Sequence, residues 1–354
     1  MKGEREQMKK LRVWWVIGCI VLGGLWSLTG CARKEKEAAA KQSTPLASLG
    51  EDVITLEEAV FYTRMLQESW EHTYYEHYGQ DMWQEDLGEE AGTLSQLLKR
   101  DVLDALTEIH LLCVHAKEYG VELTKEEQEV IAGRAEAFME SNTPGVLEAA
   151  GATVATVEAF LQRNELAAKV AEAMKTDCEP KIDKDAARVG KLTYALFATT
   201  GTFDAEGNCT PFTEEELEQV RTDAESFVIR AQELGSVAEA GAEISHTVLD
   251  VYYNEESDGG AHPLVAQAAR QLKAGQVSDM IETAEGYYIV QCVSEYDEAA
   301  TLENLELHEE NERLKYYGEV LEAWRQETPP EVDEALWETV QVEEMLTDPA
   351  LLSK

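Results

Sequence analysis

The chain has 354 residues, of which 44% are hydrophobic and 28% charged, and its formal net charge is −40. A hydrophobic fraction of this size is enough for packed cores, and the length predicts two or three domains. So large an acidic excess excludes nucleic acid and anionic lipid as electrostatic partners, because like charges repel.

Residues 1–30 have the pattern of a secretory signal peptide. Basic residues from Lys2 to Arg12 precede an apolar run from Val13 to Leu28 that is too short to span a bilayer comfortably. The residues Leu28-Thr29-Gly30-Cys31 resemble the bacterial lipobox. The resemblance implies cleavage before Cys31 and a lipid on that cysteine, so we expect an exported chain held at a membrane face. An uncleaved N-terminal anchor is the alternative.

Residues 31–51 are polar and rich in alanine, which predicts a flexible tether. Residues 52–175 predict an all-helical module, because apolar residues recur at helical spacing. Capping-box residues, Thr55 with Glu58 and Thr124 with Glu127, mark two helix starts. The predicted helices cover about 55–78, 93–119, a third after Thr124, and 156–174.

Two clusters on the first predicted helix have more than one interpretation. The aromatic residues Trp70, Tyr74, Tyr75, Tyr78 and Trp83 are expected to be mostly core, or else to line a groove for unfolded chains. The residues His72, Glu76 and His77 have metal-ligand chemistry, but without a third strong ligand we interpret them as exposed helix positions. We expect no metal and no cofactor.

The pattern changes after a proline-containing linker at residues 176–185. Residues 186–297 predict strands at 190–199, 245–254 and 286–293 and helices at 213–234 and 264–272. In residues 298–354, a long helix at about 302–326 presents Leu314, Tyr317, Leu321 and Trp324 and is expected to pack on the N-terminal helices. The predicted fold class is α+β, with an α+β domain inserted in a helical module that both flanks form.

The segment Gln271–Val290 resembles the end of the parvulin-type (PpiC-type) peptidyl-prolyl isomerase domain. The family pattern is close to "LKxGEVSxPVxTxxGYHII". Residues of this chain that fit it are Leu272, Lys273, Gly275, Val277, Ser278, Thr283, Gly286, Tyr287 and Ile289. The whole layout looks like the PrsA/SurA class of extracytoplasmic foldases, in which helical flanks surround a parvulin domain and the PrsA members are lipoproteins.

The resemblance also assigns a site. Parvulins hold a hydrogen-bonded pair of histidines, in "SHIL" and "GYHII", and this chain has Tyr194 and Tyr288 at those positions. Two tyrosines could hydrogen-bond across the same gap. The resemblance places Val265 where the family has phenylalanine, His246 near a family cysteine or aspartate, and Tyr287 beside the proline slot. With both imidazoles replaced, it implies weak or lost isomerase activity.

The leading hypothesis is therefore a membrane-anchored, extracytoplasmic foldase or chaperone that binds newly exported, unfolded polypeptides. The alternatives are an active prolyl isomerase that uses Tyr194 and Tyr288, and a ligand-binding lipoprotein of a transporter. The sequence leaves the clients and the oligomeric state open. It also leaves open whether the cysteines beyond the lipobox form disulfides, although without paired spacing we expect isolated, mostly buried thiols at Cys113, Cys178, Cys209 and Cys292.

Overall fold

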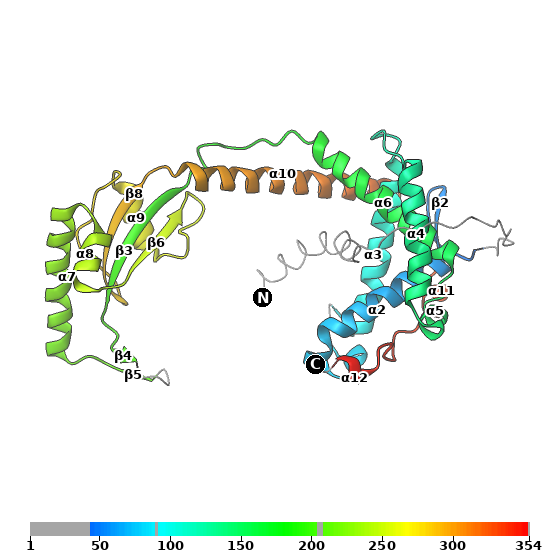
Figure 1. Cartoon of the computed structure of the whole chain (residues 1–354), viewed down its shortest axis with the longest axis horizontal. Coiled ribbons are helices and arrows are strands. Elements are labelled where there is room, and N and C mark those ends of the chain that lie inside the picture. Colours follow the sequence, from blue (N-terminus) through cyan, green and yellow to red (C-terminus); the bar gives the residue numbers. More distant parts are fainter. Residues whose placement is uncertain (1–42, 89–90, 204–207, 353–354) are drawn as a thin grey trace. The chain divides into compact units, whose positions relative to one another are not determined.

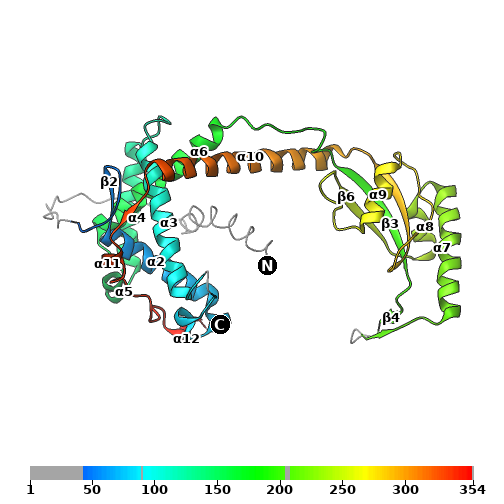
Figure 2. The same cartoon turned by 180° about the vertical axis from the view of Figure 1, so that it is seen from behind.

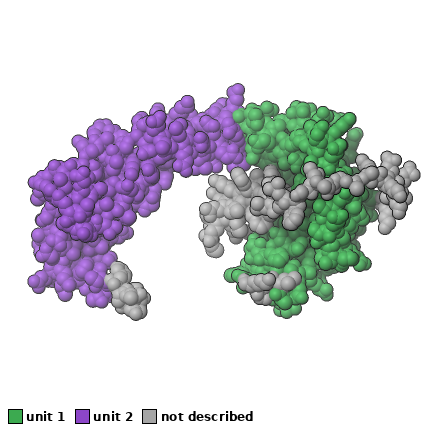
Figure 3. Space-filling view, in the orientation of Figure 1, with its two compact units in different colours: residues 1–178, 315–354 green, residues 179–314 purple. Residues whose placement is uncertain are grey.

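A computed structural model of the chain describes residues 43–88, 91–203 and 208–352. The chain divides into two compact units, Met1–Cys178 with Lys315–Lys354, and Glu179–Leu314 (Figure 3). The predicted signal peptide, the lipobox with Cys31 and most of the predicted tether lie outside the described residues. In the described part of the chain, no helix combines the length and the apolar composition that a bilayer span requires.

Helices form most of the first unit. The capping box predicted at Thr124 is confirmed, whereas at Thr55 only the threonine oxygen caps its helix, because Glu58 binds elsewhere. On the helix that begins after Thr124, Val130 is 62% exposed and Ile131 is buried. The helices before the second unit are α2 (Leu56–Tyr78), α3 (Leu94–His115), α4 (Lys125–Ser141), α5 (Pro144–Ala149) and α6 (Val154–Asp177), with a 3-10 turn, η1, at Met82–Gln84 (Figure 1).

The first unit also contains a small antiparallel sheet, with strand order β2-β1-β9. Its strands are β1 (Pro45–Leu49), β2 (Asp52–Thr55) and β9 (Glu331–Val332). The expectation of a tether up to residue 51 is therefore wrong from Pro45 onward. Leu46, Ala47 and Leu49 are buried in the helical core, and the apolar burial they gain outweighs the freedom of a tether.

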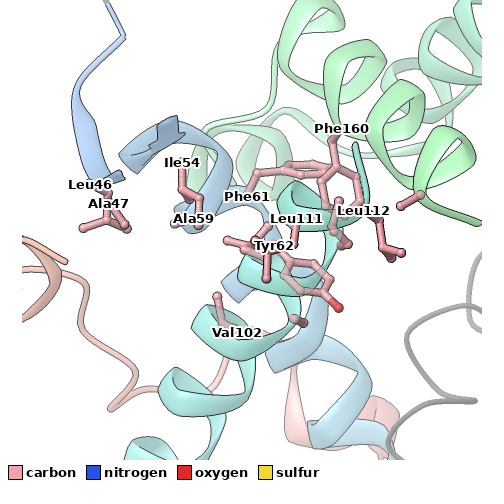
Figure 4. Close-up of a cluster of buried hydrophobic side chains, with 14 of the residues drawn as sticks. Leu46, Ala47, Ile54, Ala59, Phe61, Tyr62, Val102, Leu111, Leu112 and Phe160 are labelled. Carbon is pink, nitrogen blue, oxygen red and sulfur yellow. The ribbon is translucent and has the colours of Figure 1, made fainter. Parts of the chain in front are cut away.

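The core of the first unit lies where α2, α3 and α6 meet the sheet. Figure 4 shows Phe61 and Tyr62 of α2, Leu111 and Leu112 of α3 and Phe160 of α6 in one cluster. The ring centroids of Phe61 and Phe160 are 5.3 Å apart in an edge-to-face arrangement, a geometry that aromatic quadrupoles favour. The stripe predicted for α3 is buried throughout: Leu94, Leu98, Val102, Leu106, Ile109 and Leu112.

Helix α10 (Glu298–Glu327) contributes residues to both units, since the division falls between Leu314 and Lys315. Tyr317, Leu321 and Trp324 pack into the core of the first unit, whereas Leu314 does not reach it. The Tyr317 hydroxyl donates to Glu108 of α3 at 2.7 Å, and the Trp324 ring stacks on His115 at 3.8 Å. Two short helices, α11 (Glu334–Trp337) and α12 (Pro349–Leu352), complete this unit.

The second unit is built on a four-stranded sheet with strand order β6-β3-β8-β7. Helices α7 and α8 cover one face and α9 the other, as Figures 1 and 2 show. The sheet consists of β3 (Gly190–Ala198), β6 (Val248–Tyr253), β7 (Ile281–Glu282) and β8 (Gly286–Ser294); the helices are α7 (Glu214–Leu234), α8 (Val237–Ile244) and α9 (Pro263–Gln271), and β4 (Thr202–Phe203) pairs with β5 (Cys209–Thr210).

This arrangement confirms the α+β class, with the α+β unit inserted between helical flanks. The sequence did not indicate α8 or the short strands β4, β5 and β7. Gly286, which begins β8, has φ of 146°, and a Cβ there would strike the carbonyl oxygen of Phe197. Glycine is therefore required where β8 approaches β3 so closely.

Candidate functional site

Strand pairing brings the two predicted site tyrosines together. Tyr194 of β3 pairs with Val290, and Leu196 pairs with Tyr288 of β8, so the two tyrosines are diagonal neighbours on one face of the sheet. Their ring centroids lie 5.5 Å apart with an interplanar angle of 53°. The face they share is the one that α9 covers.

Helix α9 closes this face with small apolar side chains. Val265 is fully buried, and it belongs to the same cluster as Tyr288, Leu192 and Val290. Tyr194 is only half-buried and lies at the border of that cluster. The surface that reaches solvent is therefore aromatic at Tyr194 and aliphatic around it.

The polar groups next to Tyr288 are not those that the sequence suggested. The Tyr288 hydroxyl donates to Oε2 of Glu285 at 2.5 Å, so the expected hydrogen bond to Tyr194 is replaced by one within its own strand end. Burial raises the pKa of the Tyr288 hydroxyl, and the Glu285 carboxylate raises it further. The hydroxyl is thus a neutral donor at physiological pH, already committed to Glu285.

His262 is a neighbour of the pair that sequence reasoning missed. Its ring centroid lies 5.6 Å from that of Tyr288. Its Nδ1 accepts the backbone N–H of Leu264 at 3.2 Å and so caps the start of α9. The signal was present in the sequence, because a polar residue before Pro263 is a typical helix start.

The other two predicted pocket residues, His246 and Tyr287, lie on the opposite face of the sheet, so the structure does not bring them together with the tyrosine pair. The His246 ring stacks on Phe197 at 4.1 Å, and its Nε2 is 3.1 Å from the carbonyl oxygen of Leu196. Tyr287 packs on the cluster of Phe197 and Phe227. Successive strand residues point to opposite faces, which separates Tyr287 from Tyr288.

The first unit contains a buried ionic cluster that the sequence did not reveal. His110 of α3 is fully buried; its Nδ1 lies 2.7 Å from Asp52 of β2 and its Nε2 3.2 Å from Glu58 of α2. Arg163 of α6 lies 3.5 Å from Asp52 and 3.6 Å from Glu58. Burial alone would lower the pKa of His110, but the hydrogen bonds to Asp52 and Glu58 outweigh it and raise the pKa.

The cysteines carry no chemistry that these sites use. Of the cysteines in the described chain, Cys292 is buried, Cys113 and Cys178 are half-buried, and Cys209 is exposed. Among these four described cysteines only Cys292 is buried, so the expectation of mostly buried thiols is wrong. Burial raises the pKa of Cys113 to about 12, which keeps this thiol protonated and unreactive.

Among the described residues, no group of three or more histidine, cysteine, aspartate and glutamate side chains could hold a metal. His72, Glu76 and His77 are exposed on α2. Of the aromatic set on and after this helix, Trp70 and Trp83 are core, Tyr75 and Tyr78 are half-buried, and Tyr74 is 39% exposed. The set thus divides between the two interpretations.

No protein-family model and no curated protein matches the sequence. The structure is similar to solved structures of the foldase class that the segment Gln271–Val290 resembles. These include the peptidyl-prolyl isomerase PrsA of Bacillus cereus (15% identity, 77% of this chain and 100% of that chain covered, TM-score 0.32), a SurA-like chaperone of Campylobacter jejuni (10%, 82% and 98%, 0.29) and the foldase protein PrsA of Streptococcus pneumoniae (19%, 85% and 100%, 0.28). Structural similarity at this level does not identify the function of the tyrosine site.

Proposed function

We propose that this protein is a membrane-anchored, extracytoplasmic foldase that binds newly exported polypeptides, and that residues 186–297 form a parvulin-like domain with weak or lost prolyl isomerase activity. One observation carries the proposal. Tyr194 and Tyr288, at the positions that the parvulin resemblance gives to the histidine pair, lie 5.5 Å apart on the face covered by α9.

Prolyl isomerisation needs no cofactor, because the barrier of about 18–20 kcal/mol comes from amide resonance alone. A catalyst must hold the proline ring and favour the twisted amide over the planar one. Here the exposed part of Tyr194 offers an apolar surface to a proline ring. The Tyr288 hydroxyl cannot donate to a twisted amide while it donates to Glu285, and Val265 supplies less ring contact than phenylalanine would. The site therefore binds better than it catalyses.

A proline-limited refolding assay tests the enzymatic part. At catalytic concentrations, the wild-type protein should leave the slow phase of a proline-limited substrate nearly unchanged, while it suppresses aggregation of a denatured client at stoichiometric concentration. The Tyr194→His/Tyr288→His variant should accelerate the slow phase if the slot still admits proline. Tyr252→His, which replaces an exposed tyrosine elsewhere on the same sheet, is the control. Clear acceleration by the wild type would instead establish an active isomerase that uses tyrosines.

Anchoring is tested separately. If Cys31 carries the lipid, Cys31→Ser should move the protein from the membrane fraction to uncleaved precursor or to the medium. A wild-type protein that keeps residues 1–30 and an unchanged distribution of the variant would rule out the lipobox. The third alternative, a ligand-binding lipoprotein of a transporter, predicts tight binding of a small solute and no effect on client aggregation.

A further inference from the structure

The chain between α11 and α12 lies along α2 without forming a helix or a strand of its own. We call residues 341–348 the C-terminal strap. Its contacts with α2 and η1 all lie within the first unit. The way in which this strap is held resembles the binding of a foreign peptide more than the packing of a structural loop.

Side chains of the first unit hold the strap by its main chain. Three amide or guanidinium groups donate to strap carbonyls, and one carboxylate accepts two strap amides. The bonds run from Arg64 to Gln341 (2.9 Å), from Gln67 to Glu344 (2.7 Å) and from Gln84 to Glu343 (2.8 Å), and from the N–H groups of Leu346 and Thr347 to Glu71 (2.9 and 2.7 Å). Such bonds do not depend on which side chains the bound segment carries.

Glu71 is the central group of this array. It is fully buried, and its Oε1 also accepts from Trp83 Nε1 at 3.2 Å and Gln67 Nε2 at 3.3 Å. These two donors set the carboxylate in place, and the two strap amides complete its hydrogen bonds. Without the strap, a buried carboxylate would lose two charge-assisted bonds, so another segment with free N–H groups is the natural replacement.

The side chains of the strap add little sequence specificity to its binding. Val342 is buried and Met345 half-buried against the core, whereas Glu343, Glu344 and Leu346 are exposed. A pocket of about 620 Å³ opens beside the strap and is lined by Gln80, Asp81 and the strap itself. The strap is thus recognised through two apolar side chains, Val342 and Met345, and through hydrogen bonds to its main chain.

We propose that the stripe Arg64, Gln67 and Glu71 of α2, together with Gln84, is a binding site for an extended polypeptide segment, and that the strap is its built-in competitor. The proposal rests on the proposed foldase function, since it takes the ligand to be an unfolded client. The acidic strap residues Glu343, Glu344 and Asp348 lie on an already acidic chain and weaken its own binding, so a neutral or basic client segment competes well.

Release of the strap should therefore strengthen client binding. Val342→Ser removes a buried anchor of the strap and leaves the site intact, while Leu346→Ser makes the matched change at a position that is 38% exposed. The readouts are hydrogen exchange at the amides of Leu346 and Thr347, and the fluorescence anisotropy of labelled, reduced and amidomethylated ribonuclease. If the strap fills the site about nine-tenths of the time, Val342→Ser should tighten binding by about tenfold, and Leu346→Ser should change little.

Glu71→Gln combined with Val342→Ser should abolish the gain in client affinity. The glutamine side chain has one acceptor oxygen, whereas the two main-chain N–H groups bind both oxygens of Glu71. Faster exchange in Val342→Ser without tighter client binding would overturn the proposal, as would unchanged exchange. If no variant binds the unfolded probe, the foldase function fails rather than the site, and the site is then tested with a peptide.

The peptide test uses a chain that ends at Val340 and a labelled peptide of residues 340–352 added in trans. A second peptide, in which every residue except Val342 and Met345 is alanine or serine, should bind within about threefold of the first, because main-chain bonds carry the affinity. Binding of the native peptide alone would show that its side chains decide, and would overturn main-chain recognition. If the shortened chain does not fold, the Val342→Ser chain serves as host.

Discussion

At the scale of single residues, the two units use buried polar groups in different ways. In the second unit, the Tyr288 hydroxyl stays protonated and donates a hydrogen bond to Glu285, because burial and this carboxylate raise its pKa. In the first unit, His110 sits between two carboxylates and joins three structural elements, β2, α2 and α3. The His110 arrangement makes the stability of the first unit depend on pH in the neutral range.

The sign of this dependence follows from the pKa of His110. The histidine titrates near 6.5 when unfolded, and its pKa is higher when folded because the bonds to Asp52 and Glu58 outweigh burial. Its contribution is complete below about pH 6.5 and is lost as pH rises through the raised folded pKa. The pKa of Asp52 is lowered: burial alone would raise it, but His110 and Arg163 outweigh burial, so its contribution is lost only in acid, as pH falls through the lowered value.

His110→Gln should therefore lower the free energy of unfolding of the first unit by about 3 kcal/mol at pH 6, since Asp52 and Glu58 lose a buried cationic partner and keep only the longer contacts to Arg163. The decline in stability above pH 6.5 should also disappear. Urea unfolding followed by tryptophan fluorescence measures this, because residues 179–314 contain no tryptophan. His72→Gln, at an exposed position of α2, is the control; a retained pH slope in His110→Gln would contradict the assignment.

At the scale of elements, α10 is attached to α3 by an ion pair of Arg325 with Asp104 at 4.0 Å and by a hydrogen bond within the apolar interface. The Tyr317 hydroxyl donates to Glu108 from a side chain that is 2% exposed. Burial raises the pKa of Glu108, and the bond from Tyr317 acts against that rise. The interface therefore relies on this hydroxyl to satisfy the carboxylate.

Tyr317→Phe should destabilise the first unit by about 1–2 kcal/mol, because the carboxylate loses its donor while the ring stays in place. The pKa of Glu108 should rise further. Urea midpoints and a pH titration of stability provide the measurements. Glu108→Leu added to Tyr317→Phe should recover part of the loss, and a single variant as stable as the wild type would show that water replaces the hydroxyl at no cost.

At the scale of the whole molecule, the C-terminal part of the chain serves both units. Thr301 accepts the backbone N–H of Val189 at 3.0 Å, and Asn304 donates to the carbonyl of Ala187 at 2.9 Å, so the first turns of α10 complete the second unit. The expectation that all of residues 298–354 joins the helical module therefore differs from the observed division after Leu314.

A chain that ends at Leu314 should keep the second unit folded and lose the structure of the first, since Tyr317, Trp324 and Trp337 leave its core. A chain that ends at Asp297 should damage both units, because it also removes Thr301 and Asn304. Limited proteolysis with mass spectrometry distinguishes these outcomes. Cleavage within residues 186–297 before residues 52–175, in the chain ending at Leu314, would contradict this division of labour.

The features that could be predicted from the sequence depend on residues close together in the chain. The capping box at Thr124, the buried stripe of α3 and the strands β3 and β8 follow from spacing and local hydrogen bonding, and the structure confirms them. The proximity of the Tyr194 and Tyr288 rings was also within reach, because the resemblance aligned both strands.

Features that depend on residues far apart in the chain could be recognised only in the folded structure. Strand β1 looked like tether, and besides the adjacent β2 it pairs with β9, which lies near the other end of the sequence. The same holds for the His110 cluster, which is assembled from β2, α2, α3 and α6. It also holds for Glu71, whose hydrogen-bond donors Leu346 and Thr347 are remote in the sequence. Isolated acidic and polar residues do not reveal their partners by spacing, and the free energy that places them comes from contacts formed only after the chain has folded.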